Sequence, residues 1–300
     1  MAITVVKESA DVIEPDELLD WAIKNADPRD DDSMVACAPR LSALANNREF
    51  MRNSLCDELR LIAAGKSRMQ RSPQAYVHGS RKAAGRMFTI RSVLWTPPLA
   101  TVARSRVLQD RGFSYVTPHD HNFGLLTVGY LGSGYETVLY EYDPTRVVGF
   151  AGEDVEIEYL ETLTLSVGKV LYYRPRRDIH IQRHPSEISV SLNLISEGPN
   201  IDRVPQFQFD VDKRKIVGLL RDNDVKTQML PFAVLSLLGA DDNLVDLVLR
   251  IAQVHESEHI RSAAYRAVAS VRPKQLSELT RSGLDDKHPL VRSEIRSMLS

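Results

Sequence analysis

Two histidines stand two residues apart in the stretch TPHDHNFG, residues 117 to 124. The surrounding sequence alternates like a strand, and alternate residues of a strand face the same side of a sheet. We therefore expect His119 and His121 to direct their rings to one point, with Phe123 and Leu125 lining the same interior face. Because imidazole is a ligand for iron, copper, zinc and nickel, this spacing predicts two ligands of a metal site.

Two imidazoles are too few for a stable metal site, so a further ligand must come from elsewhere in the chain. The best candidate is His180 in RPRRDIHIQRHPSEISVSLNL, at an inward-facing position of a later predicted strand. Glu136 is a candidate for a fourth ligand, although its neighbour Tyr135 is the residue expected to face inward. The alternative interpretation is that the histidines are surface or hydrogen-bonded strand residues without a metal.

The elements that would position these side chains form three regions. From Glu14 to about Lys66, apolar residues recur at helical spacing. From Met87 to about Leu219, eight short segments rich in β-branched and aromatic residues alternate with breaks at Gly, Pro and Asp. They are MFTIRSVLW, GLLTVGYL, YETVLYEYD, VEIEYLETLTL, GKVLYYRP, DIHIQ, EISVSLNLI and PQFQFDV. This pattern predicts an antiparallel sandwich or barrel.

From Asp222 onward the helical spacing returns and repeats. Val225, Ile260 and Val291 head three similar segments, which resemble HEAT-type helical repeats. We expect a helical region over residues 1–75, a β-barrel metal domain over 76–221 and HEAT-like repeats over 222–300. The repeats either pack against the barrel or bind a partner, and a homodimer through these helices is left open.

Composition limits the partners and the compartment. The chain has 300 residues, of which 43% are hydrophobic and 26% charged, with a formal net charge of -2. This charge gives no reason to expect nucleic acid. The N-terminus lacks the features of a signal peptide and no apolar run reaches membrane-spanning length, so we expect a soluble, cytoplasmic protein without a membrane partner. Cys37 and Cys56 are too few for a disulfide framework and are expected to be reduced packing residues.

The histidine pattern resembles the cupin superfamily, whose first motif is built around H-x-H and whose second supplies a later His. GKVLYYRPRRDIH carries Gly168, Pro175 and His180 in the order of that second motif. The glutamate that usually follows the first motif is replaced here by Leu125 or Leu126. A site of three histidines is similar to the cysteine dioxygenase branch of the cupins, and the resemblance covers roughly residues 75 to 195. It implies a cupin-like β-barrel, a double-stranded β-helix, that binds Fe(II) or another divalent transition metal.

The sequence also departs from that branch. Thiol dioxygenases carry a Ser-x-His-x-Tyr strand, and the matching positions here are Ser191, Asn193 and Ile195. In that family an arginine binds the substrate, and at about the matching position this sequence has Val77 or His78. Free cysteine is therefore not the expected substrate.

The expected function is that of a non-heme Fe(II) oxygenase using dioxygen and a small, anionic substrate. Ser191, Asn193 and Tyr135 are the candidates for orienting the reactants, and Arg91 and His78 are the candidates for binding the substrate. Two other interpretations stay open. One is a non-catalytic cupin that keeps its metal for ligand sensing or protein interaction, and the other is a metal-dependent isomerase or hydrolase, because one fold hosts many chemistries.

Overall fold

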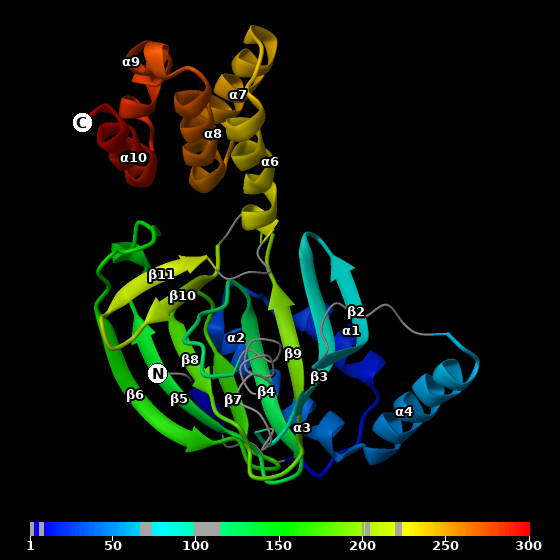
Figure 1. The fold of residues 1–300 in the computed structure, drawn as a ribbon. Coiled ribbons are helices and arrows are strands. Elements are labelled where there is room, and N and C mark those ends of the chain that lie inside the picture. Colours follow the sequence, from blue (N-terminus) through cyan, green and yellow to red (C-terminus); the bar gives the residue numbers. More distant parts are fainter. Residues whose placement is uncertain are drawn as a thin grey trace. The chain divides into compact units, whose positions relative to one another are not determined.

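Figure 1 shows the computed structural model, which describes residues 3–5, 9–66, 74–98, 115–199, 201, 205–219 and 224–300. The chain forms two compact units. The first comprises residues 1–144 and 156–201, and the second comprises residues 145–155 and 202–300. The boundaries expected near residues 75 and 221 stay a prediction.

The first unit contains two antiparallel sheets. The larger sheet has six strands in the order β1 (Ile3–Val5), β7 (Val170–Tyr173), β4 (Gly124–Leu131), β9 (Ser189–Glu197), β3 (Arg86–Trp95) and β2 (Ala75–Ala83). The smaller sheet has three strands in the order β6 (Ile157–Thr164), β5 (Glu136–Tyr142) and β8 (Asp178–Gln182). Each segment of the first unit that was predicted to be a strand is a strand, while β1 and β2 lie outside the predicted segments.

Side-chain alternation along the central strands explains how the larger sheet is covered on both faces. On β3, Phe88 and Ile90 belong to one buried cluster, whereas Val93 and Trp95 belong to another. The second cluster also contains Leu139 of β5, so it joins the two sheets. The interior between the sheets is therefore the face that carries the odd-numbered residues of β3.

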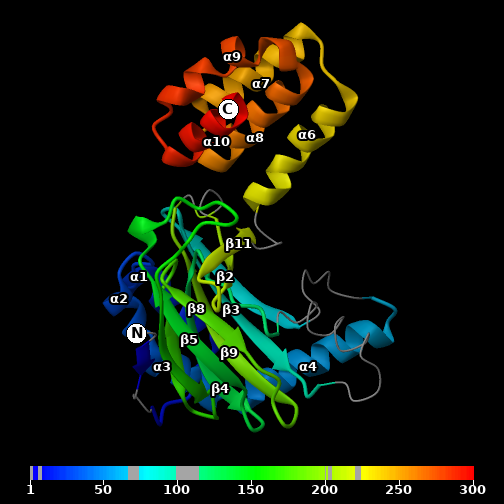
Figure 2. The same ribbon diagram turned by 60° about the vertical axis from the view of Figure 1, so that its left-hand side comes forward.

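Helices cover the other face of the larger sheet. They are α1 (Pro15–Asn25), α2 (Asp31–Val35) and α3 (Ala38–Asn46), which lie together on one side of the unit (Figure 2). Helix α1 begins where the sequence predicts it, with Pro15 in its first turn and Glu17 closing a capping box with Glu14. A fourth helix, α4 (Arg48–Ala63), follows at once, and the side chain of Asn47 caps it by accepting a hydrogen bond from the amide of Phe50.

The second unit combines a hairpin with a helical array. The hairpin pairs β10 (Phe207–Asp210) with β11 (Lys215–Leu219). The helices are α6 (Asp224–Leu238), α7 (Asp242–Val254), α8 (Glu258–Val271), α9 (Leu276–Leu279) and α10 (Pro289–Leu299). Helices α6, α7 and α10 all contact α8. Ile260 and Val291, two of the three residues expected to head repeats, are buried.

Two further sequence expectations concern cysteines and membranes. Both cysteines are free thiols, but only Cys37 is buried, and the expectation that Cys56 packs in a core is wrong because it is exposed on α4. None of the helices that the structure describes is both long enough and apolar enough to span a membrane.

Candidate metal centre

Three histidines from two distant parts of the chain meet in the first unit. His119 and His121 lie in the segment just before β4, and His180 lies in the middle of β8. All three are buried, and their candidate ligand atoms lie within 4.8 Å of one another. Within the described ranges this is the one group of three or more His, Cys, Asp or Glu residues arranged to hold a metal ion. The donor set expected from the sequence is therefore brought together by the fold.

The backbone holds two of these histidines directly opposite each other. His119 and His180 form an isolated antiparallel bridge, in which the amide of His180 donates to the carbonyl of His119 at 3.0 Å and the reverse bond measures 3.3 Å. Their Nε2 atoms lie 3.0 Å apart. Two imidazole nitrogens that share one ion at right angles, each about 2.1 Å from it, are separated by roughly 3 Å. The residues present therefore fit a divalent transition metal.

Neighbouring groups fix the orientation of each ring. Nδ1 of His119 lies 2.8 Å from the carbonyl oxygen of Thr117, so the N–H at Nδ1 donates there and Nε2 is left as the ligand atom. The ring of His121 stacks on Phe123 with a centroid separation of 4.5 Å and an interplanar angle of 19°. The ring of His180 meets Tyr173 edge to face, at 4.6 Å.

Burial also determines the charge of the cluster. It lowers the pKa of His119 below the usual value, and the nearby guanidinium of Arg91 lowers it further, against the hydrogen bond from Nδ1 to Thr117. The pKa of His180 is well below the usual value because of burial and the charges of His119, His121 and Arg91. These two imidazoles are therefore neutral near pH 7, which is the form that binds metals.

Arg91 lies beside the histidines on the interior face of β3. Burial lowers the pKa of its guanidinium to about 10, against the charge of Tyr135, which raises it. Among the residues that the structure describes, none forms an ion pair with Arg91, and its Nε atom is buried without a hydrogen-bond partner. A buried donor without a partner is costly, although the residue that carries it is only half-buried. The interior of the first unit therefore contains a positive group that an anion would compensate.

The three candidates for orienting reactants all face this interior. The hydroxyl of Ser191 accepts a hydrogen bond from the indole of Trp95 at 3.0 Å, and the side-chain oxygen of Asn193 accepts one from the hydroxyl of Thr127 at 2.7 Å. The ring of Tyr135 packs on Trp95 at 3.9 Å. Burial raises the pKa of Tyr135 well above the usual value, so its hydroxyl stays protonated.

Two candidates lie away from the cluster. His78 is on the opposite face of the larger sheet, where its ring nitrogens lie 3.2 Å from the hydroxyl of Ser54 and 3.0 Å from that of Ser92. It lines a largely apolar cavity of about 530 Å³ between α4 and the sheet. Glu136 forms a partly exposed ion pair with Arg183 at 2.7 Å. The fold therefore does not bring either residue to the three histidines.

Sequence reasoning missed three residues around the cluster. The side-chain amide of Gln182 lies 2.7 Å from Nδ1 of His180, and the hydroxyl of Tyr142 donates to the buried carboxylate of Asp120 at 2.6 Å. Gln182 could have been found, because it follows His180 by two residues and therefore shares its face of the strand. No sequence signal pairs Asp120 with Tyr142.

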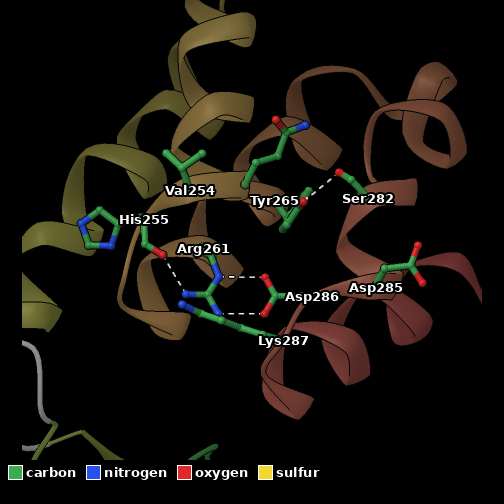
Figure 3. A pocket seen from close by; sticks show the side chains of 9 residues that line it. Val254, His255, Arg261, Tyr265, Ser282, Asp285, Asp286 and Lys287 are labelled. Atoms are coloured by element: carbon green, nitrogen blue, oxygen red, sulfur yellow. Dashed lines mark hydrogen bonds and ion pairs between the residues drawn. The ribbon is translucent and has the colours of Figure 1, made fainter.

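The second unit holds a separate, polar cavity of about 320 Å³ (Figure 3). The guanidinium of Arg261 lies in its wall and forms two hydrogen bonds of 2.7 Å with the carboxylate of Asp286. It also donates to the backbone carbonyls of His255 and Glu256, just beyond the end of α7. Because Arg261 is fully paired, it acts as a structural link between helices rather than as an unpaired cation.

Comparisons with known proteins give only distant structural similarity. No protein family model matches the sequence, and no curated protein matches it either. Ribosomal oxygenase YcfD from Escherichia coli shares 13% identity with a TM-score of 0.22, covering 61% of this chain and 42% of that chain. This chain thus aligns with less than half the length of YcfD.

Two smaller proteins show the same level of similarity. Polyketide cyclase RemF from Streptomyces resistomycificus shares 16% identity with a TM-score of 0.22, covering 53% of this chain and 84% of RemF. A Co(II) complex of HppE shares 9% identity with a TM-score of 0.20, covering 60% of this chain and 95% of HppE. Because these TM-scores lie below 0.5, we take the function from the geometry of the site alone.

Proposed function

We propose that this protein is a non-heme Fe(II)-dependent oxygenase that acts on a small anionic substrate with dioxygen. The observation that carries the proposal is the convergence of three buried histidines beside a half-buried arginine without an ion-pair partner among the described residues. We also propose that the two antiparallel sheets of the first unit form a cupin-like barrel and that the C-terminal helices are HEAT-like repeats.

The donor set is compatible with iron, because imidazole binds Fe(II) as well as other divalent transition metals. Three neutral imidazoles add no negative charge, so a bound divalent cation keeps its full charge and favours anionic ligands. Fe(II) bound here would supply the dioxygen chemistry that protein side chains lack. The burial of the histidines and the bridge between His119 and His180 keep the ligand atoms in place and restrict water.

Arg91 is the proposed substrate anchor. A guanidinium can hold a carboxylate through two parallel hydrogen bonds, and a bound carboxylate would give the half-buried guanidinium of Arg91 an ion-pair partner. Tyr135 has a protonated hydroxyl on the same side of the sheet and can donate a hydrogen bond to the same ligand. Ser191 and Asn193 already bond to Trp95 and Thr127, so we assign them a role in holding the interior wall in position.

The metal assignment is tested by measuring iron in protein purified without oxygen. We expect about one Fe(II) per chain, and His121→Ala should lose it because two ligands retain an ion poorly. His255→Ala, which changes a histidine of the second unit, is the matched control and should keep the iron. Full iron occupancy in His121→Ala would overturn the assignment.

The oxygenase activity is tested with iron-loaded protein in an oxygen electrode, using a panel of amino and keto acids. Substrate-dependent dioxygen uptake that disappears in His180→Ala would support an oxygenase. Conversion of a substrate without dioxygen uptake would indicate an isomerase or hydrolase instead. Tight metal and ligand binding without any conversion would indicate the non-catalytic alternative.

A further inference from the structure

Two buried hydroxyls near the three histidines make no hydrogen bond within the described part of the chain. They belong to Tyr173 of β7 and Thr137 of β5, whose exposed fractions are 1% and 0%. The ring of Tyr173 also meets that of His180 edge to face. Nearly all buried hydroxyls in folded proteins are hydrogen-bonded, so two exceptions in one place indicate that a partner is bound there.

The two hydroxyls come from opposite walls of the interior. Tyr173 lies on the larger sheet and belongs to the buried cluster that joins the two sheets. Thr137 lies on the smaller sheet, two residues before Leu139 of the same cluster, and therefore faces the same interior. Burial raises the pKa of Tyr173 to about 12, against the hydroxyls of Thr137 and Tyr135, which lower it. The hydroxyls are therefore neighbours, and that of Tyr173 stays a donor.

The larger sheet carries Arg91 on the same interior face. In the strand register, the row of residues that begins at Arg91 on β3 continues across β9 and β4 and ends at Leu171 on β7. Tyr173 follows Leu171 by two residues, so Arg91 and Tyr173 lie in adjoining rows, three strand spacings or roughly 14 Å apart. Tyr135 acts on the pKa of both, although burial is the larger cause in each. Polar side chains therefore connect the guanidinium with the two hydroxyls.

We propose that the hydroxyls of Tyr173 and Thr137 form a second subsite beside the metal centre, which binds an uncharged oxygen of the substrate. This inference rests on the proposed function, in which Arg91 holds a carboxylate. An oxygen of the substrate can accept a hydrogen bond from Tyr173, and a substrate hydroxyl can also donate one to Thr137. The substrate class is then a hydroxy or oxo acid whose second oxygen is remote from its carboxylate. A plain acid leaves both hydroxyls unpaired and binds more weakly.

The subsite is tested by isothermal titration calorimetry with the Zn(II)-loaded chain, because Zn(II) has no redox chemistry and the acids are bound without conversion by dioxygen. The probes are unbranched acids of about three to six carbons with a terminal hydroxyl, each compared with its parent acid. We expect the best hydroxy acid to bind about tenfold more tightly than its parent. Tyr173→Phe and Thr137→Val should each reduce this preference and leave the affinity for the parent acid unchanged.

Tyr140→Phe is the matched control and should keep the preference, because Tyr140 follows Leu139 on β5 and faces the other side of the smaller sheet. Equal affinities of the original chain for each hydroxy acid and its parent would overturn the subsite, whether or not the variants fold. So would an unchanged preference in Tyr173→Phe and Thr137→Val, which would indicate that a water molecule satisfies the two hydroxyls. If the original chain bound no Zn(II), or bound Zn(II) but none of the acids, the proposed function itself would be wrong.

Discussion

The hydroxyl of Tyr142 donates a 2.6 Å hydrogen bond to the carboxylate of Asp120, the residue between His119 and His121. Asp120 is fully buried, and its side chain reaches the end of β5. Burial and the charge of Asp120 raise the pKa of Tyr142, so the hydroxyl remains a donor throughout the physiological range. This bond fastens the segment that carries two of the three ligands to the smaller sheet.

Tyr142→Phe is therefore expected to loosen the metal site without unfolding the chain. Loss of a hydrogen bond to a buried carboxylate costs about 1.5 to 3 kcal/mol. Part of this cost should lower the metal affinity, by about tenfold, because the segment that carries two ligands is held less firmly. Competition with a chelator measures the affinity. Tyr159→Phe, at an exposed tyrosine of β6, is the control, and equal affinities in the two variants would contradict the anchoring role.

Arg91→Met should separate stability from substrate binding. The change removes a half-buried guanidinium whose buried Nε lacks a hydrogen-bond partner, so the free energy of unfolding should rise by about 1 kcal/mol. Iron should be retained, while KM for an acidic substrate rises sharply. Chemical denaturation, metal analysis and dioxygen uptake measure the three effects. A destabilised Arg91→Met chain would mean that the guanidinium has a structural partner.

Free cysteine should be oxidised very slowly or not at all. The strand that carries Ser191 and Asn193 continues with Ile195, which cannot donate a hydrogen bond, and no arginine stands at Val77 or His78. Sulfinate formation is measured with iron-loaded protein and cysteine under oxygen. Rapid turnover would show that Arg91 and Tyr135 can replace the groups used by thiol dioxygenases.

The ion pair of Arg261 and Asp286 should make the helices of the second unit sensitive to acid. Burial opposes ionisation of Asp286, but hydrogen bonds from Arg261 and from the amide of His288 outweigh it, and the pKa of Asp286 is lowered. The stabilisation is therefore present above about pH 4, the usual range of an aspartate, and is lost as the pH falls through the lower pKa of the folded chain.

Asp286→Asn tests this pair at neutral pH. We expect the free energy of unfolding of the second unit to fall by about 3 to 5 kcal/mol, because the buried guanidinium of Arg261 loses its partner. Helical circular dichroism should report the loss. Trp21 and Trp95 are the two tryptophans and both belong to the first unit, so their fluorescence provides an internal control. If the original chain and the Asp286→Asn variant lost their helical signal over the same acidic pH range, the ion pair would not be the cause of the acid sensitivity.

Deleting residues 222–300 should cause aggregation. The second unit includes the segment 145–155 and the β10–β11 hairpin, in which Phe207 and Phe209 are buried. A methyl group on Gly149 would lie 2.8 Å from the ring of Phe207 and 3.6 Å from His259, so segment, hairpin and α8 meet at this point. Light scattering measures aggregation. If the truncated chain stayed soluble and bound metal, this would favour the alternative that the helical region only binds a partner.

The strands and the three histidines could be predicted because both depend on local patterns. Alternation identifies a strand, and a two-residue spacing places His119 and His121 on one face whatever their partners are. The strand β1 was missed because three residues carry too little pattern, and its pairing with β7 depends on residues far along the chain.

The position of His78 shows the limit of such reasoning. The face to which a strand residue points depends on the register with its neighbour, and β2 contains an irregularity between Val77 and Gly79. Tyr76 and Val77 lie opposite Ser92 and Arg91, so neighbouring residues face opposite sides of the sheet. The sequence around His78 gives no indication of this register, and the residue lies on the helix-covered face.

The backbone bridge between His119 and His180 joins positions that are 61 residues apart. During synthesis, the first two ligands leave the ribosome well before the third, and β8 must then pair with β5 before the rings can meet. Closing so long a loop is slow relative to local folding. Metal binding should therefore occur late in the folding of each new chain. The rate of iron incorporation would then report when the first unit has finished folding.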